Sequence, residues 1–249
     1  MATVVCDLDG VIYIDGSPVD GAAAALERMR NDGHQLLFVT NNATRHVDAL
    51  VTEIEAASGF RPRREDILSS SMAAASMLQG RANSAFVVGE AGLSATLADW
   101  GISSVDAATA ESVVVGLDRG VTYDKLRDAS LAIRRGALFI ATNLDSTYPT
   151  PTGLWPGGGA LVAALATASG TTPEVAGKPA EPIRALLRSQ IENEEVWVVG
   201  DRPDTDLALG DAEGWKTALV LTGVTTDASG VSPAPTVVLD SIAGLPELL

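Results

Sequence analysis

Cysteine is almost absent from this chain of 249 residues: Cys6 is the only one, so no disulfide can form within the chain. Aromatic side chains make up only 4% of the residues, whereas hydrophobic residues as a whole make up 46%. A core of the usual size is therefore possible, but it must be built from Val, Leu, Ile and Ala side chains.

Long hydrophobic runs are also missing. No apolar segment approaches the roughly 20 residues that a membrane-spanning helix needs. Residues 1–4 lead straight into an expected strand, without the basic segment and apolar region of a secretory signal. We therefore expect a cytoplasmic protein that has no membrane partner.

Positive charge is scarce. The chain has 17 Lys and Arg residues against 32 Asp and Glu residues, which gives a net charge of −15 at pH 7. This charge argues against a nucleic-acid partner and against binding to anionic membranes. It also repels anionic substrates, so a phosphate site would need local positive groups that overcome the field of the whole chain.

Short Val-rich segments alternate with Ala-rich amphipathic segments, a pattern typical of an α/β fold with a parallel sheet. The simplest organisation is a doubly wound, Rossmann-like core formed by residues 1–78 and 176–249, with a second α/β unit inserted at 79–175. The Gly- and Pro-rich stretch 149–159 is expected to be a loop whose end opens a helix. Expected strands of the core are 3–7, 35–40, 195–200, 217–221 and 237–239, and its expected helices are 20–31, 46–57 and 205–213. The inserted unit is expected to have strands at 85–88, 112–117 and 137–141 and helices at 91–100, 123–135 and 159–168.

The motif Asp7-Leu8-Asp9-Gly10 stands where the first strand is expected to end. Residues two apart in a strand point the same way, so Asp7 and Asp9 can converge while Leu8 points into the core. Two carboxylates at close range repel unless a cation, a proton or water separates them. Gly10 allows a sharp turn and a close approach of a ligand to the backbone. The motif thus predicts a Mg²⁺ and phosphate site with an aspartate nucleophile. An ordinary Asp-Gly turn is the alternative, and a calcium loop does not fit because its twelve-residue ligand pattern is missing.

Two further polar motifs follow predicted strands. Thr40-Asn41-Asn42 offers a hydroxyl and backbone N–H groups that can bind phosphate oxygens, although a turn or helix cap is the more common explanation of this motif in isolation. In Gly177-Lys178-Pro179, the lysine lies on a constrained backbone, and its ammonium can bind a phosphate. A solvated surface lysine is the simpler explanation when this motif is taken alone.

A third motif places three carboxylates after the strand expected at 195–200. Asp201 is placed to bind a hard cation, Asp206 to orient Lys178 or a metal-bound water, and Asp204 to cap a helix. An acidic helix start is the alternative. All these motifs fall at carboxyl ends of predicted parallel strands, where open α/β sheets bind their ligands, so their coincidence favours one common site.

Together, Asp7-Leu8-Asp9-Gly10, Thr40-Asn41, Lys178-Pro179 and Gly200-Asp201 with Asp204-Thr205-Asp206 resemble the four motifs of the haloacid dehalogenase (HAD) superfamily. The insertion is similar in size to the C2-type cap of that superfamily. The runs Ala141-Thr142-Asn143-x-Asp145 and Pro156-Gly157-Gly158-Gly159-Ala160 resemble the NagD-like, p-nitrophenylphosphatase-like branch, with a weaker similarity to glycerol-3-phosphate phosphatases.

This resemblance implies a phosphatase that acts on a small phosphorylated metabolite with Mg²⁺ as cofactor. It implies that Asp7 is the nucleophile that forms an aspartyl-phosphate and that Asp9 is the general acid and base. Mg²⁺ would be held by Asp7, the Asp9 main-chain oxygen and Asp201, with Asp206 in support. The phosphoryl oxygens would be held by Thr40, Lys178 and backbone N–H groups near Asp9, Gly10, Asn41 and Asn42.

Residues 143–153 resemble the specificity loop of the family, which implies substrate contacts from Asn143 and Tyr148. Packing within the loop is the alternative for Tyr148, and Arg45 either faces the pocket or begins a solvated helix. Glycerol 3-phosphate, phosphoglycolate, sugar phosphates and nucleoside monophosphates all remain open as substrates, and caps of this kind imply a possible homodimer. The rival function is a phosphate-binding or phosphorelay receiver-like module, which would be shorter and would have no acidic cluster after its lysine.

Overall fold

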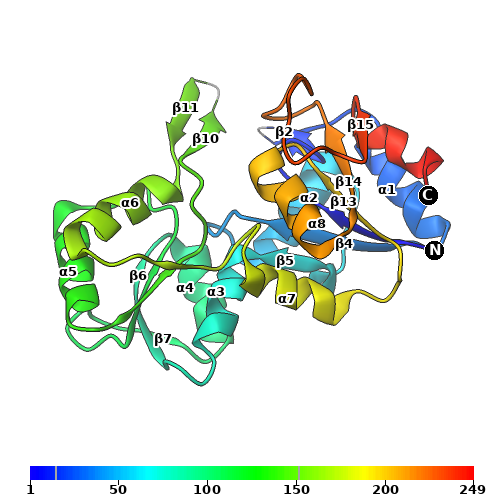
Figure 1. Ribbon diagram of the computed structural model, residues 1–249. Coiled ribbons are helices and arrows are strands. Elements are labelled where there is room, and N and C mark those ends of the chain that lie inside the picture. Colours follow the sequence, from blue (N-terminus) through cyan, green and yellow to red (C-terminus); the bar gives the residue numbers. More distant parts are fainter. Residues whose placement is uncertain (15, 151) are drawn as a thin grey trace. The chain divides into compact units, whose positions relative to one another are not determined.

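The computed structural model describes residues 1–14, 16–150 and 152–249 of the chain (Figure 1). It divides into two compact units: residues 1–40, 48–68 and 184–249 form the first, and residues 41–47 and 69–183 form the second. The second unit therefore includes 41–47, 69–78 and 176–183, which lie outside the predicted insertion 79–175. The predicted domain boundaries stay a prediction.

The first unit is built on a six-stranded sheet whose assigned neighbours β1–β13, β1–β4, β13–β14 and β14–β15 are parallel. Its order is β15-β14-β13-β1-β4-β5, so the chain winds outward from β1 in one direction and from β13 in the other. This is the doubly wound order, with its switch point between β1 and β13. The strands are β1 (Thr3–Cys6), β4 (Gln35–Thr40), β5 (Ile67–Ser69), β13 (Val196–Gly200), β14 (Lys216–Val220) and β15 (Val237–Leu239).

The helices of the first unit cover both faces of this sheet, because crossovers that run in opposite directions put α1 and α8 on opposite sides. In α1, buried Ala22, Ala25, Leu26 and Met29 recur at helical spacing and form its apolar face. α1 packs against η3, while ion pairs from α7 to Glu213 join α7 to α8. The bounds are α1 (Ala22–Asn31), α2 (Val47–Ser58), η1 (Arg64–Asp66), α7 (Glu181–Gln190), η2 (Pro203–Leu207), α8 (Ala208–Glu213) and η3 (Ile242–Glu247), with a short hairpin of β2 (Tyr13–Ile14) and β3 (Ser17–Pro18).

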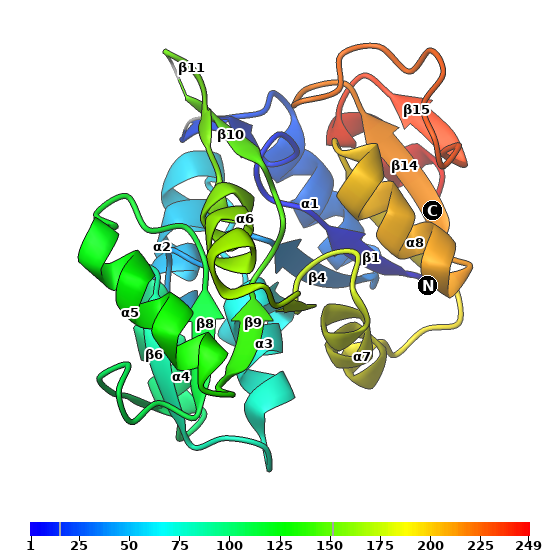
Figure 2. The ribbon, with the colours of Figure 1, turned by 60° about the vertical axis from the view of Figure 1, so that its left-hand side comes forward.

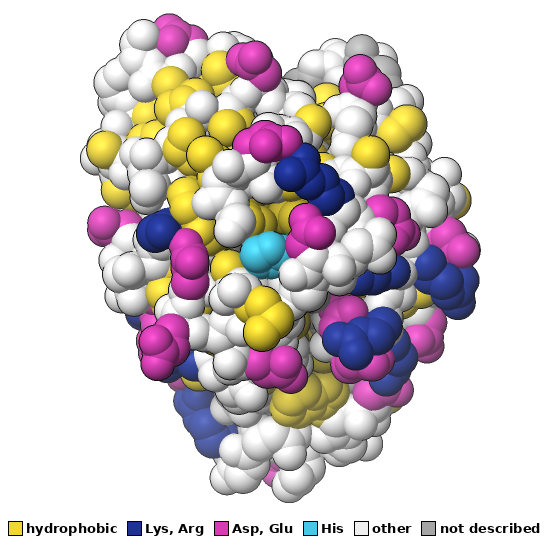
Figure 3. Space-filling model, turned by 90° about the vertical axis from the view of Figure 1, so that its right-hand side faces the viewer, with side chains coloured by type: hydrophobic (Ala, Val, Ile, Leu, Met, Phe, Trp, Pro, Cys, Tyr) yellow, Lys and Arg dark blue, Asp and Glu magenta, His cyan; other side chains and the backbone are white. Residues whose placement is uncertain are grey.

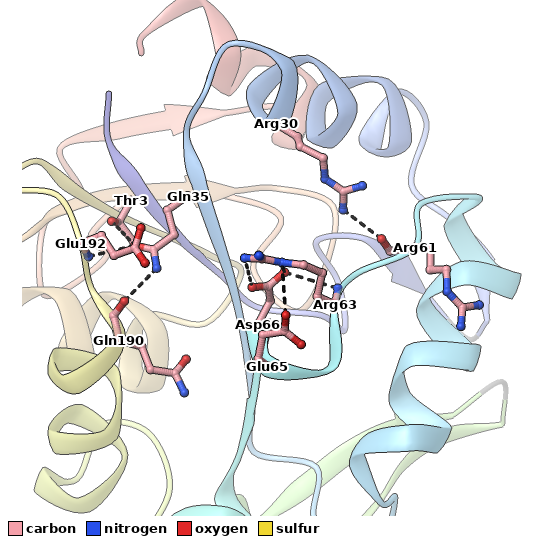
Figure 4. A network of polar contacts seen from close by, with 9 residues as sticks. All are labelled: Thr3, Arg30, Gln35, Arg61, Arg63, Glu65, Asp66, Gln190 and Glu192. Carbon is pink, nitrogen blue, oxygen red and sulfur yellow. Dashed lines mark hydrogen bonds and ion pairs between the residues drawn. The ribbon is translucent and has the colours of Figure 1, made fainter.

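A network of polar contacts joins the amino ends of β1 and β4 to the segment before β13 (Figure 4). The Gln35 side chain donates to the Gln190 carbonyl at 2.8 Å and accepts from the Thr3 hydroxyl at 2.7 Å and the Glu192 N–H at 3.0 Å. All of these groups find partners within the chain, so this edge of the sheet is braced. The opposite edge, at the carboxyl ends of the strands, is the place for chemistry.

The second unit has a five-stranded parallel sheet of its own, in the order β12-β9-β8-β6-β7. Figures 1 and 2 show α5 and α6 against one face of this sheet and α3 and α4 against the other. The predicted α/β class with parallel sheets is therefore confirmed in both units. The bounds are β6 (Ser84–Val88), β7 (Ser103–Ser104), β8 (Ser112–Val115), β9 (Leu138–Ala141), β12 (Glu174–Val175), α3 (Ser70–Leu78), α4 (Ala91–Asp99), α5 (Tyr123–Arg134) and α6 (Gly158–Ser169).

The prediction of a loop at 149–159 is wrong for 149–150 and 153–156, which belong to an antiparallel hairpin, whereas its end does open a helix, α6; residue 151 lies outside the described residues. The hairpin consists of β10 (Thr147–Thr150) and β11 (Gly153–Pro156), and it stands out from the rest of the second unit in Figures 1 and 2. Tyr148 and Trp155 are directly opposite each other and pack edge to face, with ring centroids 6.3 Å apart. Such a cross-strand aromatic pair stabilises two short strands that proline and glycine would otherwise disfavour.

The surface carries charges of both signs. On the face that Figure 3 draws, Lys and Arg side chains lie beside Asp and Glu side chains and do not form a patch of their own. In the part of the chain that the structure describes, no helix combines the length and apolar character needed to cross a membrane.

Candidate active site

Three aspartates meet at the switch point of the first sheet. Asp7, Asp201 and Asp206 each place one carboxylate oxygen within 4.8 Å of the others. Asp7 follows β1, and Asp201 follows β13, which pairs with β1 in parallel register. Asp201 and Asp206 are only 2% and 1% exposed. Buried carboxylates so close together repel strongly unless a cation or protons compensate them, and their oxygens are the ligands that Mg²⁺ prefers. The donor set therefore fits Mg²⁺.

The turn after β1 sets the directions of the side chains in the motif Asp7-Leu8-Asp9-Gly10. Leu8 is fully buried, as predicted, whereas Asp9 is exposed and lies outside the cluster of three aspartates. The Ile12 N–H donates to the Leu8 carbonyl at 2.9 Å, and the Gly10 N–H donates to the Tyr13 carbonyl at 2.8 Å. The Gly10 N–H is thus used within the turn, and its contact with phosphate stays a prediction.

Gly10 instead permits a close approach of its backbone to Asp201. Its φ of 83° lies in the left-handed region, and a Cβ atom there would lie 2.6 Å from Asp201 Oδ2. The Gly10 carbonyl accepts from the Thr222 hydroxyl at 2.5 Å, which ties the turn to the segment after β14.

The segment after β14 also surrounds Asp201, a feature that the motif search missed. The Val224 N–H donates to Asp201 Oδ2 at 2.5 Å. A Cβ atom on Gly223 would lie 1.9 Å from the same oxygen, so only glycine fits against the carboxylate. The available signal was Thr222-Gly223 just after a predicted strand, at the same edge of the sheet as the other motifs.

Asp206 enters the cluster through a wide turn of helix. Residues Pro203–Leu207 form a π-helix, where the sequence pattern predicted an ordinary helix from 205. Such turns often occur at functional sites. Asp206 accepts from the Arg202 N–H at 3.1 Å, and its side chain packs so tightly on Gly200 that a Cβ atom there would lie 2.2 Å away. Asp206 is thus a third candidate ligand, beyond the supporting role predicted for it.

The phosphate-binding candidates fall in both units. Thr40, at the end of β4, is 2% exposed and belongs to the first unit. Asn41, Asn42 and Lys178 belong to the second, where Lys178 is 6% exposed. Asn42 Oδ1 accepts from both the backbone N–H and the hydroxyl of Thr44, at 3.0 and 2.7 Å, so this side chain closes a local turn.

Asn143 makes contacts within the chain at both ends of its amide. Its Nδ2 donates to the Asn41 carbonyl at 2.8 Å, and its Oδ1 accepts from the Asp145 N–H at 3.1 Å. Because it is also buried at 7% exposure, these contacts favour a positioning role over the predicted direct contact with substrate.

A second polar cluster lies at the switch point of the second sheet, after β6 and β8. Arg119 forms a two-pronged ion pair with Glu90, with nitrogen–oxygen distances of 2.6 and 2.8 Å. The hydrogen bond from Arg119 lowers the pKa of Glu90, and the nearby charge of Arg45 adds to this effect. The same hydrogen bond raises the pKa of Arg119, with a smaller contribution from Tyr148. Arg45 and Tyr148 therefore lie near this pair, which the sequence patterns did not reveal.

Comparisons with known proteins agree with these features. A family described as haloacid dehalogenase-like hydrolase matches residues 4–103, and one described as HAD-hydrolase-like matches residues 175–245. The chain is 37% identical over 237 residues to a D-glycerol 3-phosphate phosphatase of Mycobacterium tuberculosis, a match that covers 93% of this chain and 66% of the relative. The chain thus spans about two thirds of that relative's length. It is also 35% identical over 225 residues to an acid sugar phosphatase of Staphylococcus haemolyticus, covering 88% of this chain and 85% of the relative.

Solved structures show the same similarity. A p-nitrophenyl phosphatase from Archaeoglobus fulgidus superposes with a TM-score of 0.91 at 33% identity, over 99% of this chain and 98% of its own. The glycerol phosphate phosphatase of Mycobacterium tuberculosis, solved in complex with magnesium, superposes with a TM-score of 0.86 at 37% identity, over 96% of this chain and 74% of its own.

Proposed function

Because this chain belongs to the haloacid dehalogenase-like hydrolases, we propose that it is a Mg²⁺-dependent phosphatase of small phosphate monoesters. The observation that carries the proposal is the cluster of Asp7, Asp201 and Asp206 at the switch point of the first sheet. The relatives named as glycerol 3-phosphate and sugar phosphatases favour a phosphorylated polyol or sugar as the substrate.

The residues around the cluster fit a bound Mg²⁺ ion. Asp7 and Asp201 would hold it through carboxylate oxygens and Asp9 through its main-chain oxygen, with Asp206 as a further carboxylate in reach. When bound, the ion offsets the negative charge of the nucleophile and the phosphate, which otherwise repel each other. Glycines at 10 and 223 leave room for Asp201 to hold its place in this cluster.

The chemistry itself belongs to two side chains. An Asp7 carboxylate oxygen attacks the phosphorus in line with the ester bond, and the bond to the leaving oxygen breaks as the bond to Asp7 forms. Asp9 gives its proton to the leaving oxygen. It then takes a proton from the water that attacks the aspartyl-phosphate, which releases inorganic phosphate and restores Asp7. The exposed position of Asp9 suits a group that must reach both leaving group and water.

Positive groups would hold the phosphoryl oxygens. We assign this role to the Thr40 hydroxyl, the Lys178 ammonium and the backbone N–H groups of Asn41 and Asn42. Fixed donors of this kind supply the local positive field that a chain of net charge −15 otherwise lacks. Formation of a homodimer through residues 79–175 stays a prediction.

Hydrolysis of p-nitrophenyl phosphate with and without Mg²⁺ tests the proposal. We expect turnover that excess EDTA abolishes and added Mg²⁺ restores. The Asp7→Asn variant should keep its fold, measured by circular dichroism, and lose nearly all turnover, because an amide cannot act as the nucleophile. A near-native rate in this variant, or activity in EDTA, would refute the mechanism.

A panel of phosphate esters ranked by kcat/KM then identifies the substrate. Glycerol 3-phosphate and sugar phosphates should rank above phosphoglycolate and nucleoside monophosphates. A protein that accumulates phosphorylated Asp7 without releasing phosphate would instead be the receiver-like module.

A further inference from the structure

The side chain of Asn41 holds both backbone polar groups of Lys178. The Lys178 N–H donates to Asn41 Oδ1 at 2.8 Å, and Asn41 Nδ2 donates to the Lys178 carbonyl at 3.3 Å. One amide side chain thus makes the pair of bonds that a neighbouring strand would make. All of these atoms belong to the second unit.

This contact continues a strand ladder at the point where the ladder stops. Beyond β12, the Ala176 and Gly177 N–H groups donate to the carbonyls of Ala141 and Thr142, at 2.9 and 2.8 Å. At the next residue, Lys178, the Asn41 amide takes over. A Cβ atom on Gly177 would lie 2.4 Å from Asn41 Oδ1 and 2.5 Å from the Thr142 carbonyl oxygen, so the residue before the lysine must be glycine.

Asn41 is itself fixed by the Asn143-x-Asp145 motif. Its carbonyl accepts from Asn143 Nδ2 at 2.8 Å and from the Ser70 hydroxyl at 2.7 Å. Its Nδ2 faces both oxygens of Asp145, at 3.4 and 3.3 Å. An ionised carboxylate only accepts hydrogen bonds, so Asp145 requires the NH₂ end of the Asn41 amide on its side. The Oδ1 end must then face the Lys178 N–H.

We infer that Asn41 is a positioning residue that fixes the backbone of Lys178, and that Asp145 sets the orientation of the Asn41 amide. A lysine side chain has a long flexible stem, so a fixed backbone at its root limits where the ammonium can lie. β10 begins two residues after Asp145, and the predicted specificity hairpin therefore shares an anchor with the predicted phosphate-binding lysine. The kinetic consequences of this inference rest on the proposed function.

Three variants separate the contacts. Asn41→Asp keeps the oxygen that accepts from the Lys178 N–H, but it puts a second oxygen against the Lys178 carbonyl and the Asp145 carboxylate. Asp145→Asn keeps an oxygen that can accept from Asn41. The double variant removes the repulsion between the two carboxylates but leaves oxygen against oxygen at Lys178. Asn193→Asp is a control, because the Asn193 amide donates to the Thr3 hydroxyl at the braced edge of the first sheet.

In Asn41→Asp, we expect the KM for p-nitrophenyl phosphate and the inhibition constant of inorganic phosphate to rise together by about tenfold to a hundredfold. The Mg²⁺ concentration for half-activation should stay within about twofold, because neither Asn41 nor Asp145 is among the candidate metal ligands. The double variant should remain impaired, Asp145→Asn should show a smaller change in the same direction, and the control should match the wild type.

Two kinetic outcomes would overturn the inference. One is an unchanged KM and phosphate inhibition constant in Asn41→Asp. The other is full recovery in the double variant, which would mean that repulsion between carboxylates was the whole effect.

Amide hydrogen exchange tests the contact between the Asn41 amide and the Lys178 backbone (the Asn41–Lys178 clamp) without a measurement of enzyme activity. In Asn41→Ala, the Lys178 amide should exchange faster, while amides of the first sheet keep their protection. Unchanged exchange at Lys178 would contradict the clamp. If the wild type hydrolyses no phosphate ester but Asn41→Ala still exchanges the Lys178 amide faster than the wild type does, the proposed function is refuted and the inference about Asn41 stands.

Discussion

A methyl group added at Gly223 should weaken Mg²⁺ binding without replacing any candidate ligand, because it displaces the carboxylate of Asp201. The Cβ atom of Gly223→Ala would lie 1.9 Å from Asp201 Oδ2 and 2.5 Å from Asp201 Cγ. The backbone of Gly223 is outside the left-handed region, so alanine brings no conformational strain of its own. The whole effect of the substitution therefore falls on the position of Asp201.

The size of the effect follows from these distances. Ordinary van der Waals contacts begin near 3.4 Å, so the carboxylate oxygen must retreat by about 1.5 Å. A shift of that size breaks its 2.5 Å hydrogen bond from the Val224 N–H. Loss of a hydrogen bond to a charged group costs about 1.5–3 kcal/mol, which corresponds to a roughly tenfold to hundredfold loss of affinity. Mg²⁺ tolerates little deviation from its preferred ligand geometry, so we expect the upper part of this range.

Calorimetric titration with Mg²⁺ in the absence of substrate measures the affinity directly, and half-activation of p-nitrophenyl phosphate hydrolysis provides a second readout. Gly120→Ala is the control, because its Cβ atom would meet only Asp118 Oδ1, at an ordinary 3.6 Å. The reasoning fails if Gly223→Ala binds Mg²⁺ within about twofold of the wild type while the control behaves as expected.

Three other perturbations have defined outcomes. The Arg119 hydrogen bond lowers the pKa of Glu90 below 4.5, so the pair stabilises the folded state above about pH 4.5, and this contribution is lost as the pH falls through the lowered pKa. Glu90→Gln should therefore flatten the acid side of a plot of Tm against pH, and an unchanged slope would contradict the assignment. Tyr148→Leu should change the ranking of phosphate esters by kcat/KM more than it changes the Mg²⁺ requirement, whereas an equal loss for all esters would indicate a packing role. Leu8→Ala should lower the free energy of unfolding by about 2–5 kcal/mol in a urea titration, since the side chain is fully buried, and a loss below about 1 kcal/mol would mean that the turn after β1 tolerates a cavity.

The strands and helices with a clear periodic pattern were predictable from the sequence. The strands at 35–40 and 237–239 have their predicted bounds, and β1 and α1 differ from prediction by one or two residues. Parallel central strands are buried on both faces and are therefore continuous apolar runs, as Leu36–Val39 is in β4. Other elements were missed: β7 and β12 have only two residues each, whereas α7 was overlooked although Ile183, Leu186 and Leu187 recur in it at helical spacing.

The hairpin β10–β11 was missed for a different reason. Each strand contains a proline, and a glycine begins β11, so the local composition is that of a loop. The paired strands place Tyr148 against Trp155, seven residues apart in sequence, and this cross-strand contact favours the hairpin over the loop that the composition indicates. The cross-strand contact outweighs local propensity here, and the π-helical turn that carries Asp206 is likewise a departure from the ordinary helix that the local pattern predicts.

For the candidate site, the sequence identified carboxylates but not the groups that hold them. Asp7, Asp201 and Asp206 were predictable because they follow strands whose carboxyl ends share one edge of the sheet. The contacts that orient them involve backbone atoms of Gly200, Gly223 and their neighbours, and a motif search does not see backbone atoms. The same is true of Asn41, whose sequence context indicates a turn but whose side chain completes a strand ladder.

Glycine is the common element in both units, and its positions explain why charged groups can be buried in a chain with so few aromatic residues to enclose them. At 200 and 223, a Cβ atom would collide with Asp206 or Asp201, and at 177 it would collide with the Asn41 amide. In each case the missing side chain lets the backbone itself approach the polar group. Backbone donors are fixed by the sheet and cost little further ordering, whereas long side chains would have to be ordered one by one. The backbone at the carboxyl ends of the strands thus fixes the positions of the charged side chains, which is why a single methyl group at 223 should disturb them.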